Sequence, residues 1–417
     1  MLPALRSTWA LFLGIALIML CNGLQGTLLG LRAGLEGFST SVTGAIMTAY
    51  YLGFLAGSQL VPGLVGGVGH IRVFAALASL ASSSVLIHTI FVDPWAWSLM
   101  RFITGFSYAG LYIVIESWLN ERATNETRGQ LLSIYMLVSV GAYASGQFLL
   151  NVGTPSGFQL FILASVLVSF ALVPISLAPI QAPPFEQRER LGLGRLYRAS
   201  PLGIVGAIGT GVGNGILVSM AAVYGLELDL SVAQITMLAA AIQIGALILQ
   251  WPIGHLSDIF DRRLIITIVT FLAGVVALLG IPAEAMGGWV LLLALGLLGG
   301  LNLPMYALCI AHTNDHLNPS QMIAASGSLV LANGLGASVG PLLAAQFMNI
   351  AGPSGFLLSL SLVHFLIGLF ALYRMTRSAA PEDQGHYVPM DPQSSSGAVA
   401  LAAEEQIEIA EEEAGQQ

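Results

Sequence analysis

Residues 264–283 read LIITIVTFLAGVVALLGIPA, which is 20 consecutive positions without a charged side chain. A helix needs about 20 apolar residues to cross a hydrocarbon core of ~30 Å. The stretch is apolar on every face, whereas a strand of a membrane barrel alternates in polarity over about ten residues. It therefore predicts a transmembrane helix.

The composition of the whole chain has the same character. Of the 417 residues, 56% are hydrophobic and 9% are charged, whereas soluble proteins average roughly 25% charged residues. So few charges cannot cover a water-facing surface, which excludes soluble enzymes and nucleic-acid-binding proteins. We expect the lipid bilayer to surround most of the chain.

Eleven further apolar runs resemble the first one, and together they predict an all-α integral membrane protein with twelve transmembrane helices. The run nearest the N-terminus, residues 9–31, is polar near its end and has no small-residue cleavage site. We therefore expect a retained helix instead of a signal peptide. The twelve predicted spans are 9–31, 41–63, 72–92, 95–118, 130–151, 157–179, 202–226, 232–254, 264–283, 288–311, 321–349 and 355–373.

The connection at 183–200 is the longest and most basic loop, and it divides the helices six and six. We predict an N-terminal six-helix bundle over 1–182, a basic cytoplasmic linker over 183–200 and a C-terminal six-helix bundle over 201–377. Residues 378–417 contain nine acidic side chains and no basic one. This composition predicts a disordered acidic cytoplasmic tail, with a short helix as the alternative.

The two halves align at a constant offset of 192 positions. Asn22-Gly23 then matches Asn214-Gly215, and Gly53 matches Gly245. This pattern predicts two parallel six-helix repeats, as in transporters that rock one half against the other around a central site.

The positions of the arginines predict the orientation. The chain has 14 arginines and no lysine, and positive charge accumulates in short cytoplasmic loops. With both termini in the cytoplasm, twelve arginines lie on that side and only Arg32 lies outside. The twelve are Arg6, Arg72, Arg122, Arg128, Arg188, Arg190, Arg195, Arg198, Arg262, Arg263, Arg374 and Arg377. We expect a multi-pass protein of the bacterial inner membrane.

Residues 254–263 read GHLSDIFDRR. They resemble the signature loop of the major facilitator superfamily, in which a glycine, a leucine and an aspartate at alternate positions precede basic residues. Asp261 replaces the second glycine of that pattern. In the family this loop holds the outward-facing state, so the resemblance implies gating roles for Asp258, Arg262 and Arg263. An ordinary positive cytoplasmic loop is the alternative.

The corresponding loop of the first half, residues 62–72, keeps little of this pattern, and Gly66 occupies the position of the aspartate. Downstream, Glu121 and Arg128 resemble a second family element that pairs with this loop. We therefore predict a gating cluster of Arg72, Glu121 and Arg128.

The fourth predicted helix carries polar side chains at steps of three and four, which places them on one face. These residues are Arg101, Gly105, Tyr108, Tyr112 and Glu116. Arg101 resembles an arginine that the family ties to proton coupling, and a charge inside a membrane is functional by default. We predict Arg101 and Glu116 as proton-coupling residues. A structural salt bridge between Glu116 and Arg72 is the alternative.

Other polar residues inside the spans are candidates for the substrate cavity, which helices 1, 4, 7 and 10 line in this superfamily. Hydrogen bonds between helices are the alternative role for each of them. The candidates are Asn22, Gln25, Tyr108, Tyr112, Asn214, Gln243, Asn302 and Tyr306.

The resemblance covers residues 9–377 and points to poorly characterised bacterial permeases of the superfamily. It implies a monomeric, proton-coupled secondary active transporter that moves a small organic solute by alternating access. An uncoupled facilitator and a transporter-like sensor or scaffold are the alternatives. The sequence shows no paired catalytic residues and no cofactor motif, and His312 and His316 lack a third metal ligand. We therefore predict neither an enzyme nor a metal site.

Overall fold

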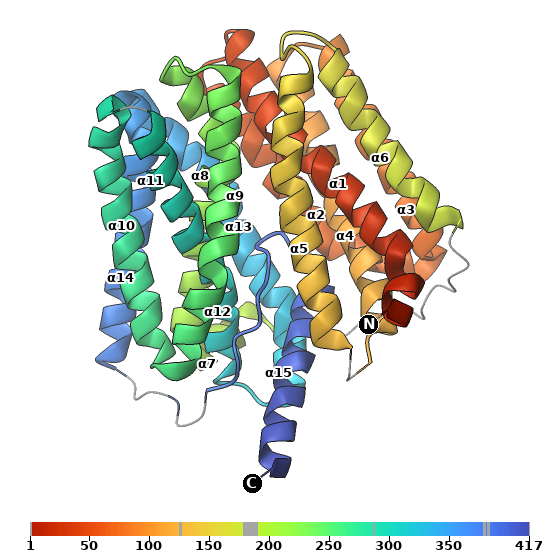
Figure 1. Cartoon of the computed structure of the whole chain (residues 1–417), viewed down its shortest axis with the longest axis vertical. Helices are drawn as coiled ribbons and strands as arrows, with labels where there is room; N and C mark the ends of the chain where they lie inside the picture. The colour runs from red at the N-terminus through yellow and green to blue at the C-terminus, as the bar shows by residue number, and fades with distance from the viewer. Residues whose placement is uncertain are drawn as a thin grey trace. The chain divides into compact units, whose positions relative to one another are not determined.

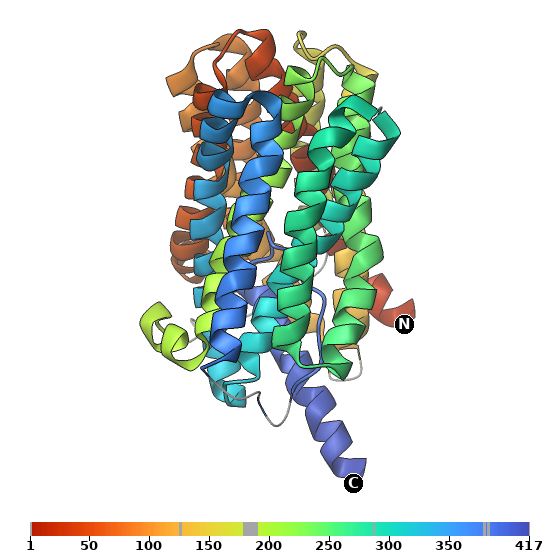
Figure 2. The same cartoon turned by 90° about the vertical axis from the view of Figure 1, so that its left-hand side faces the viewer.

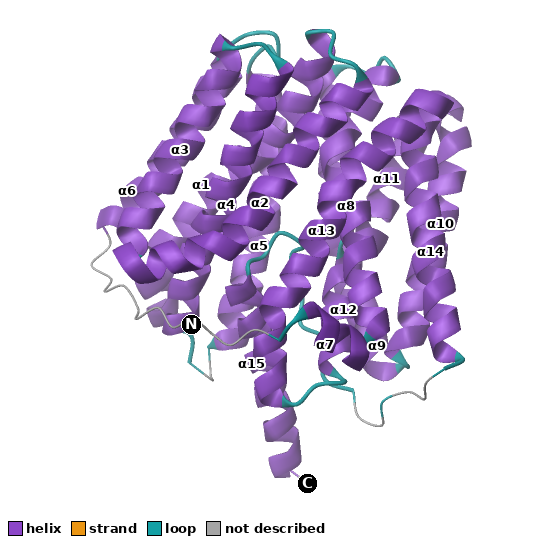
Figure 3. Ribbon diagram, turned by 180° about the vertical axis from the view of Figure 1, so that it is seen from behind, coloured by secondary structure: helices purple, strands orange, loops and turns teal. Residues whose placement is uncertain are grey.

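The computed structural model describes residues 2–124, 127–177, 191–286, 288–377, 381 and 384–416. Within these residues the regular structure is helical and contains no strand (Figure 3). The helices are α1 (Leu2–Leu35), α2 (Thr40–Val68), α3 (His70–Ile90), α4 (Pro94–Arg122), α5 (Arg128–Phe148), η1 (Leu149–Val152), α6 (Gln159–Leu177), α7 (Leu193–Ala199), α8 (Pro201–Glu227), α9 (Val232–Ile259), α10 (Arg262–Met286), α11 (Gly288–Asn302), α12 (Pro304–Asn314), α13 (Pro319–Ala351), η2 (Gly352–Ser354), α14 (Gly355–Met375) and α15 (Ser396–Gln416).

Eleven helical stretches of the described residues are long and apolar enough to cross a membrane. One of them, Pro319–Met375, is 57 residues long and contains both α13 and α14. The short helix η2 separates these two at Gly352, whose φ of 65° suits glycine. Counting α13 and α14 separately gives twelve spans, which confirms the predicted all-helical membrane fold.

One predicted span, 288–311, is interrupted in the structure. Helix α11 ends at Asn302 and α12 begins at Pro304. Proline has no N–H to donate and its ring crowds the carbonyl four residues earlier, so the regular helix stops there. The interruption places Asn302 at a helix end inside an apolar span.

Contacts between Cα atoms divide the chain into two compact units (Figure 1). Unit 1 comprises Met1–Gln187, Val218–Ala240 and Pro341–Phe356, and unit 2 comprises Arg188–Leu217, Ala241–Gly340 and Leu357–Gln417. Unit 1 therefore contains α1 to α6 together with one end of α8, α9 and α13. The predicted division into two six-helix bundles at residues 183–200 stays a prediction.

Glycines allow the closest helix crossings in each unit. In unit 1, a Cβ atom added at Gly53 of α2 would lie 1.9 Å from the carbonyl oxygen of Phe102 of α4. In unit 2, a Cβ atom at Gly245 of α9 would lie 1.8 Å from the carbonyl oxygen of Gly296 of α11. Small residues let membrane helices approach this closely. Gly53 and Gly245 are repeat mates in the sequence, so the two repeats use the same kind of crossing.

Aromatic packing joins other helices of unit 2. Figure 2 shows α10 in green and α14 in blue side by side, and the rings of Phe271 and Phe365 lie 5.8 Å apart between them. The described part of the linker also belongs to this unit, because Leu191 N–H donates to Ala324 O over 2.9 Å. Residues 183–190 of the predicted linker lie outside the described residues.

The tail contains a helix within residues 384–416, which corresponds to the alternative of a short helix. Helix α15 covers Ser396–Gln416, and Ala398–Ala403 are at most 2% exposed. This apolar stretch, AVALAA, precedes the acidic cluster and provides a surface that can be buried. The total charge of the tail hid this local pattern. Residues 378–380, 382–383 and 417 lie outside the described residues.

Candidate functional site

A polar cluster is buried within unit 1, between helices α1, α2 and α4. Asn22 Nδ2 donates to the hydroxyl oxygens of Tyr112, over 2.9 Å, and of Tyr50, over 3.3 Å. The ring of Tyr108 lies 6.3 Å from that of Tyr50 and 6.0 Å from that of Tyr112. We call Asn22, Tyr50, Tyr108 and Tyr112 the tyrosine cluster. Three of its members were predicted, and Tyr50 was missed.

Arg101 lies at the edge of the tyrosine cluster. Its guanidinium carbon is 4.3 Å from the centre of the Tyr50 ring, and its Nη2 is 3.9 Å from the sulfur of Met47. The side chain is 3% exposed, and its Nε and Nη1 atoms have no hydrogen-bond partner among the described residues. Arg101 thus brings a positive charge into the apolar interior of unit 1.

The local sequence fixes the position of Arg101. Asp93 caps the start of α4 by accepting hydrogen bonds from the N–H groups of Trp95 and Ala96, over 2.9 and 3.0 Å. One turn after Arg101, a Cβ atom at Gly105 would lie 1.9 Å from the carbonyl oxygen of Tyr50. The absent side chain therefore allows α2 to place the Tyr50 ring beside the guanidinium.

Gln25 follows Asn22 by one turn of α1 and is fully buried. Both polar atoms of its amide lack a hydrogen-bond partner among the described residues. A buried amide without partners costs free energy unless another molecule satisfies it. Gln25 therefore remains a candidate for ligand contact.

Glu116, the second predicted coupling residue, is 1% exposed. It accepts a hydrogen bond from the Tyr135 hydroxyl of α5 over 2.5 Å. The alternative salt bridge does not form, because Arg72 is exposed and has no ion pair with Glu116 within the described residues. Arg101 and Glu116 are 15 positions apart, or about 22 Å along α4. The structure does not bring these two charges together.

In the predicted gating cluster of the first half, Arg72 and Glu121 do not pair with each other. Arg72 and Glu121 are both exposed, and no ion pair joins them in the part of the chain that the structure describes. Arg128 begins α5. The roles of these three residues stay predictions.

The other cavity candidates lie in unit 2. Asn214, Gln243, Asn302 and Tyr306 are all buried. The amide of Asn302 has no hydrogen-bond partner among the described residues at either polar atom. A Cβ atom at Gly213 would lie 2.2 Å from its Oδ1, so α8 packs directly on this amide. Their roles in substrate binding stay predictions.

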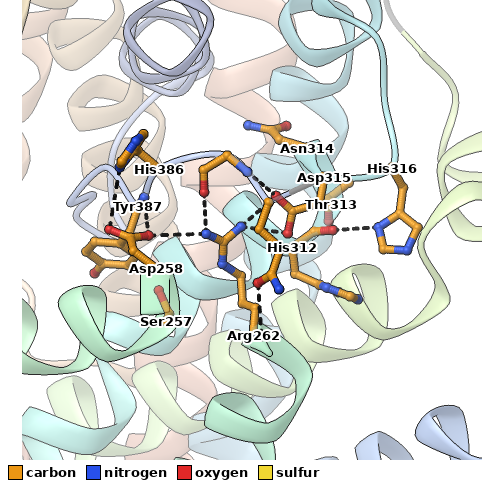
Figure 4. Close-up of polar contacts among 12 residues, drawn as sticks. Ser257, Asp258, Arg262, His312, Thr313, Asn314, Asp315, His316, His386 and Tyr387 are labelled. Carbon is orange, nitrogen blue, oxygen red and sulfur yellow. Dashed lines mark hydrogen bonds and ion pairs between the residues drawn. The ribbon is translucent and has the colours of Figure 1, made fainter. Parts of the chain in front are cut away.

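The predicted gating loop is built around Arg262 (Figure 4). Arg262 Nη1 contacts both carboxylate oxygens of Asp315, at 2.7 and 2.6 Å, and Nη2 lies 3.3 Å from Asp258. The Nη2 atom also donates to the carbonyl oxygen of Gly385 over 2.5 Å. The side chains of Arg262 and Asp315 are each 1% exposed. Two of the three predicted gating residues therefore share one network.

The carboxy-terminal segment completes this network from outside the twelve spans. Tyr387 N–H donates to Asp258 over 2.8 Å, and Gly385 N–H donates to Asp315 over 3.0 Å. A Cβ atom at Gly254 would lie 2.3 Å from the Tyr387 ring, so the glycine of the signature loop makes room for it. Further along, Gln406 accepts from Asn314 Nδ2 over 2.6 Å.

Sequence reasoning missed Asp315 as a partner of the gating loop. It lies 53 positions after Arg262, in the short connection between α12 and α13, and the sequence alone does not indicate the pairing. Burial raises the pKa of Asp315 above its usual value, and the neighbouring Arg262 opposes that shift.

Arg263, the third predicted gating residue, turns away from Arg262's partners. It pairs with Asp261 at 2.7 Å. The hydrogen bond from Arg263 lowers the pKa of Asp261. The residue that replaces the family's second glycine therefore stabilises the turn between α9 and α10.

Comparisons with known proteins agree with this architecture. The sequence model of the Major Facilitator Superfamily matches residues 203–394. Two curated relatives, both called uncharacterized MFS-type transporter YcaD, match over 90% of this chain and 98% of their own length. The protein from Escherichia fergusonii is 24% identical over 380 residues, and that from Salmonella typhi is 26% identical over 384 residues.

Solved transporters share the fold at low sequence identity. The nucleoside transporter NupG is 13% identical, with a TM-score of 0.74 over 89% of this chain and 99% of its own. A variant of the Escherichia coli fucose:proton symporter FucP is 12% identical, with a TM-score of 0.56 over 89% and 99%. These likenesses show the fold alone, because one fold serves different substrates.

The apolar helices of the described residues, with buried polar groups inside them, define a multi-pass membrane protein. The match over residues 203–394, the relatives of nearly equal length and the shared fold make the chain similar to members of the major facilitator superfamily.

Proposed function

We propose that the protein is a monomeric secondary active transporter that moves a small organic solute across the bacterial inner membrane by alternating access. The observation that carries this proposal is the tyrosine cluster with Arg101 at its edge, because these residues place hydroxyl, amide and guanidinium groups inside transmembrane helices. Polar groups within a membrane protein are costly and mark substrate or ion pathways. The relatives are called transporters, which supports the same activity here.

Proton coupling is the finer part of this proposal, and we place the proton on Glu116. Of the two predicted coupling residues, only a carboxylate can gain and lose a proton, because arginine stays protonated in proteins. Glu116 is buried and bonded to Tyr135, so a change of its environment between states would change its affinity for protons. The uncoupled facilitator is the alternative that the next experiment tests.

Glu116→Gln is expected to abolish uptake driven by a pH gradient, because the amide cannot carry a proton. Exchange of solute at equal pH should remain, since it needs no net proton movement. The measurement is flux of a panel of organic solutes into proteoliposomes, with and without the gradient. Asp229→Asn, which changes an exposed acid in the loop after α8, is the control. Normal gradient-driven uptake by well-folded Glu116→Gln protein would favour the uncoupled facilitator.

The proposed orientation places both termini in the cytoplasm. The native cysteines Cys21 and Cys309 are fully buried, so an introduced cysteine can report alone. We expect Val152→Cys, at a 74% exposed position after α5, to react with a membrane-impermeant maleimide in intact cells. Arg195→Cys, exposed in α7, should react only after the membrane is permeabilised. The reverse pattern would invert the orientation.

A further inference from the structure

We propose that Arg101 binds the negative charge of the ligand, so that the solute of this transporter is an organic anion with a single carboxylate. The claim that this anion is transported rests on the proposed function. The claim that it binds at Arg101 rests on the charges and contacts within unit 1.

The positive charge of Arg101 has no counter-ion in the described structure. A guanidinium offers five N–H donors in a planar fork. At Arg101 two of the three nitrogens, Nε and Nη1, have no hydrogen-bond partner, and Nη2 faces only the sulfur of Met47. No carboxylate of the described residues lies within 4.0 Å of this side chain. An isolated charge in such surroundings is unfavourable until an anion or water reaches it.

The buried acid of α4 cannot neutralise Arg101. Glu116 lies about 22 Å away along the helix, and its carboxylate accepts from the Tyr135 hydroxyl. On the outer side, Glu36 is already paired with Arg32 at 2.5 Å. The interior of unit 1 around Arg101 therefore has one uncompensated positive charge.

The groups around Arg101 indicate the chemistry of the ligand. The free Nε and Nη1 edge matches the two oxygens of a carboxylate in a bidentate contact. The Tyr50 ring lies beside the guanidinium, and the rings of Tyr108 and Tyr112 lie next to that of Tyr50, so the body of a ligand held by Arg101 would meet aromatic side chains. A cationic ligand would be repelled, and a neutral one would leave the charge uncompensated.

Binding to the full-length protein in detergent tests the charge preference directly. The probes are three pairs of similar size in which a neutral amide replaces the carboxylate: benzoate and benzamide, lactate and lactamide, and propanoate and propanamide. We expect at least one carboxylate to bind tenfold or more tightly than its amide, measured by calorimetry and by the shift in Tm. Arg101→Gln should weaken that carboxylate at least tenfold, and Arg101→Lys should weaken it less. Arg195→Gln, an exposed arginine of α7, is the control.

The ligand-free protein provides a second test. Because Arg101→Gln removes a buried, uncompensated charge, its Tm without ligand should equal or exceed that of the natural protein. A purely structural arginine predicts a lower Tm and unchanged binding of all six probes. Either equal binding of every carboxylate and its amide, or unchanged carboxylate binding by Arg101→Gln, would overturn the proposal.

Flux measurements separate this inference from the proposed function. If a carboxylate binds through Arg101 but does not cross proteoliposome membranes, the anion site stands and the transport function fails for that ligand. If only the neutral amides cross, the transport function stands and the anion preference fails.

Discussion

Arg262→Ala is expected to lower the free energy of unfolding by about 3–5 kcal/mol, the usual cost of breaking a buried ion pair. The variant leaves Asp315 buried at 1% exposure without its bidentate partner, and it removes the donor to the Gly385 carbonyl. Thermal and denaturant unfolding of the purified protein in detergent measures the loss.

The neighbouring ion pair is the matched control for this experiment. The Arg263 pair with Asp261 is more exposed, at 8% and 28% of the two side chains. Arg263→Ala should therefore cost less than Arg262→Ala, because Asp261 is 28% exposed and stays partly solvated without its partner. In a double-mutant cycle, Arg262→Ala and Asp315→Asn should cost less together than the sum of the two changes. Equal losses for Arg262→Ala and Arg263→Ala would contradict the network described here.

Gly53→Ala is expected to destabilise unit 1 by about 3 kcal/mol or more, the upper range for overpacking. The new methyl group would lie 1.9 Å from the carbonyl oxygen of Phe102. Backbone on the facing helix cannot move aside as a flexible side chain can, so α2 and α4 must separate. The same movement shifts Tyr50 from Arg101. The measurement is the yield of monodisperse protein together with its Tm.

Gly141→Ala in α5 tests whether the effect depends on the crossing. A Cβ atom at Gly141 meets nothing within 4 Å, and alanine favours a helix over glycine by up to about 1 kcal/mol. This variant should therefore be neutral or slightly more stable. A similar loss from both substitutions would mean that Gly53 acts through helix propensity instead of helix packing.

The twelve spans could be predicted because the physical requirement is simple. A helix that crosses the bilayer needs one long apolar run, and each run is visible without knowledge of the rest of the chain. The break before Pro304 could not have been predicted from the proline alone, because helices continue past Pro62, Pro174, Pro252, Pro282 and Pro341. The buried part of the tail could not be seen from its total charge, because AVALAA at 398–403 precedes the acids.

The residues of the candidate site that lie on one helix could be predicted from their spacing. The contacts between residues of different helices could not. Spacing placed Tyr108 and Tyr112 on one face of α4, and both are in the tyrosine cluster. Tyr50 comes from another helix. The only indication of its role in the sequence was its hydroxyl group, which lies in an apolar run and needs a hydrogen-bond partner when it is buried. Asp315 and Gly385 reach Arg262 from 53 and 123 positions away. Such long-range pairs have no local signature.

The partners of Arg262 also set an order of events during synthesis. Asp258 precedes Arg262 by four residues, whereas the Gly385 carbonyl follows it by 123. At 5–20 residues per second, the ribosome makes Gly385 roughly 6–25 s after Arg262. Every apolar span has left the ribosome's catalytic centre by then, because α14 ends at Met375. The network around Arg262 is therefore completed only after the last apolar span has been synthesised, and a premature stop codon after residue 377 would leave Arg262 without the Gly385 carbonyl.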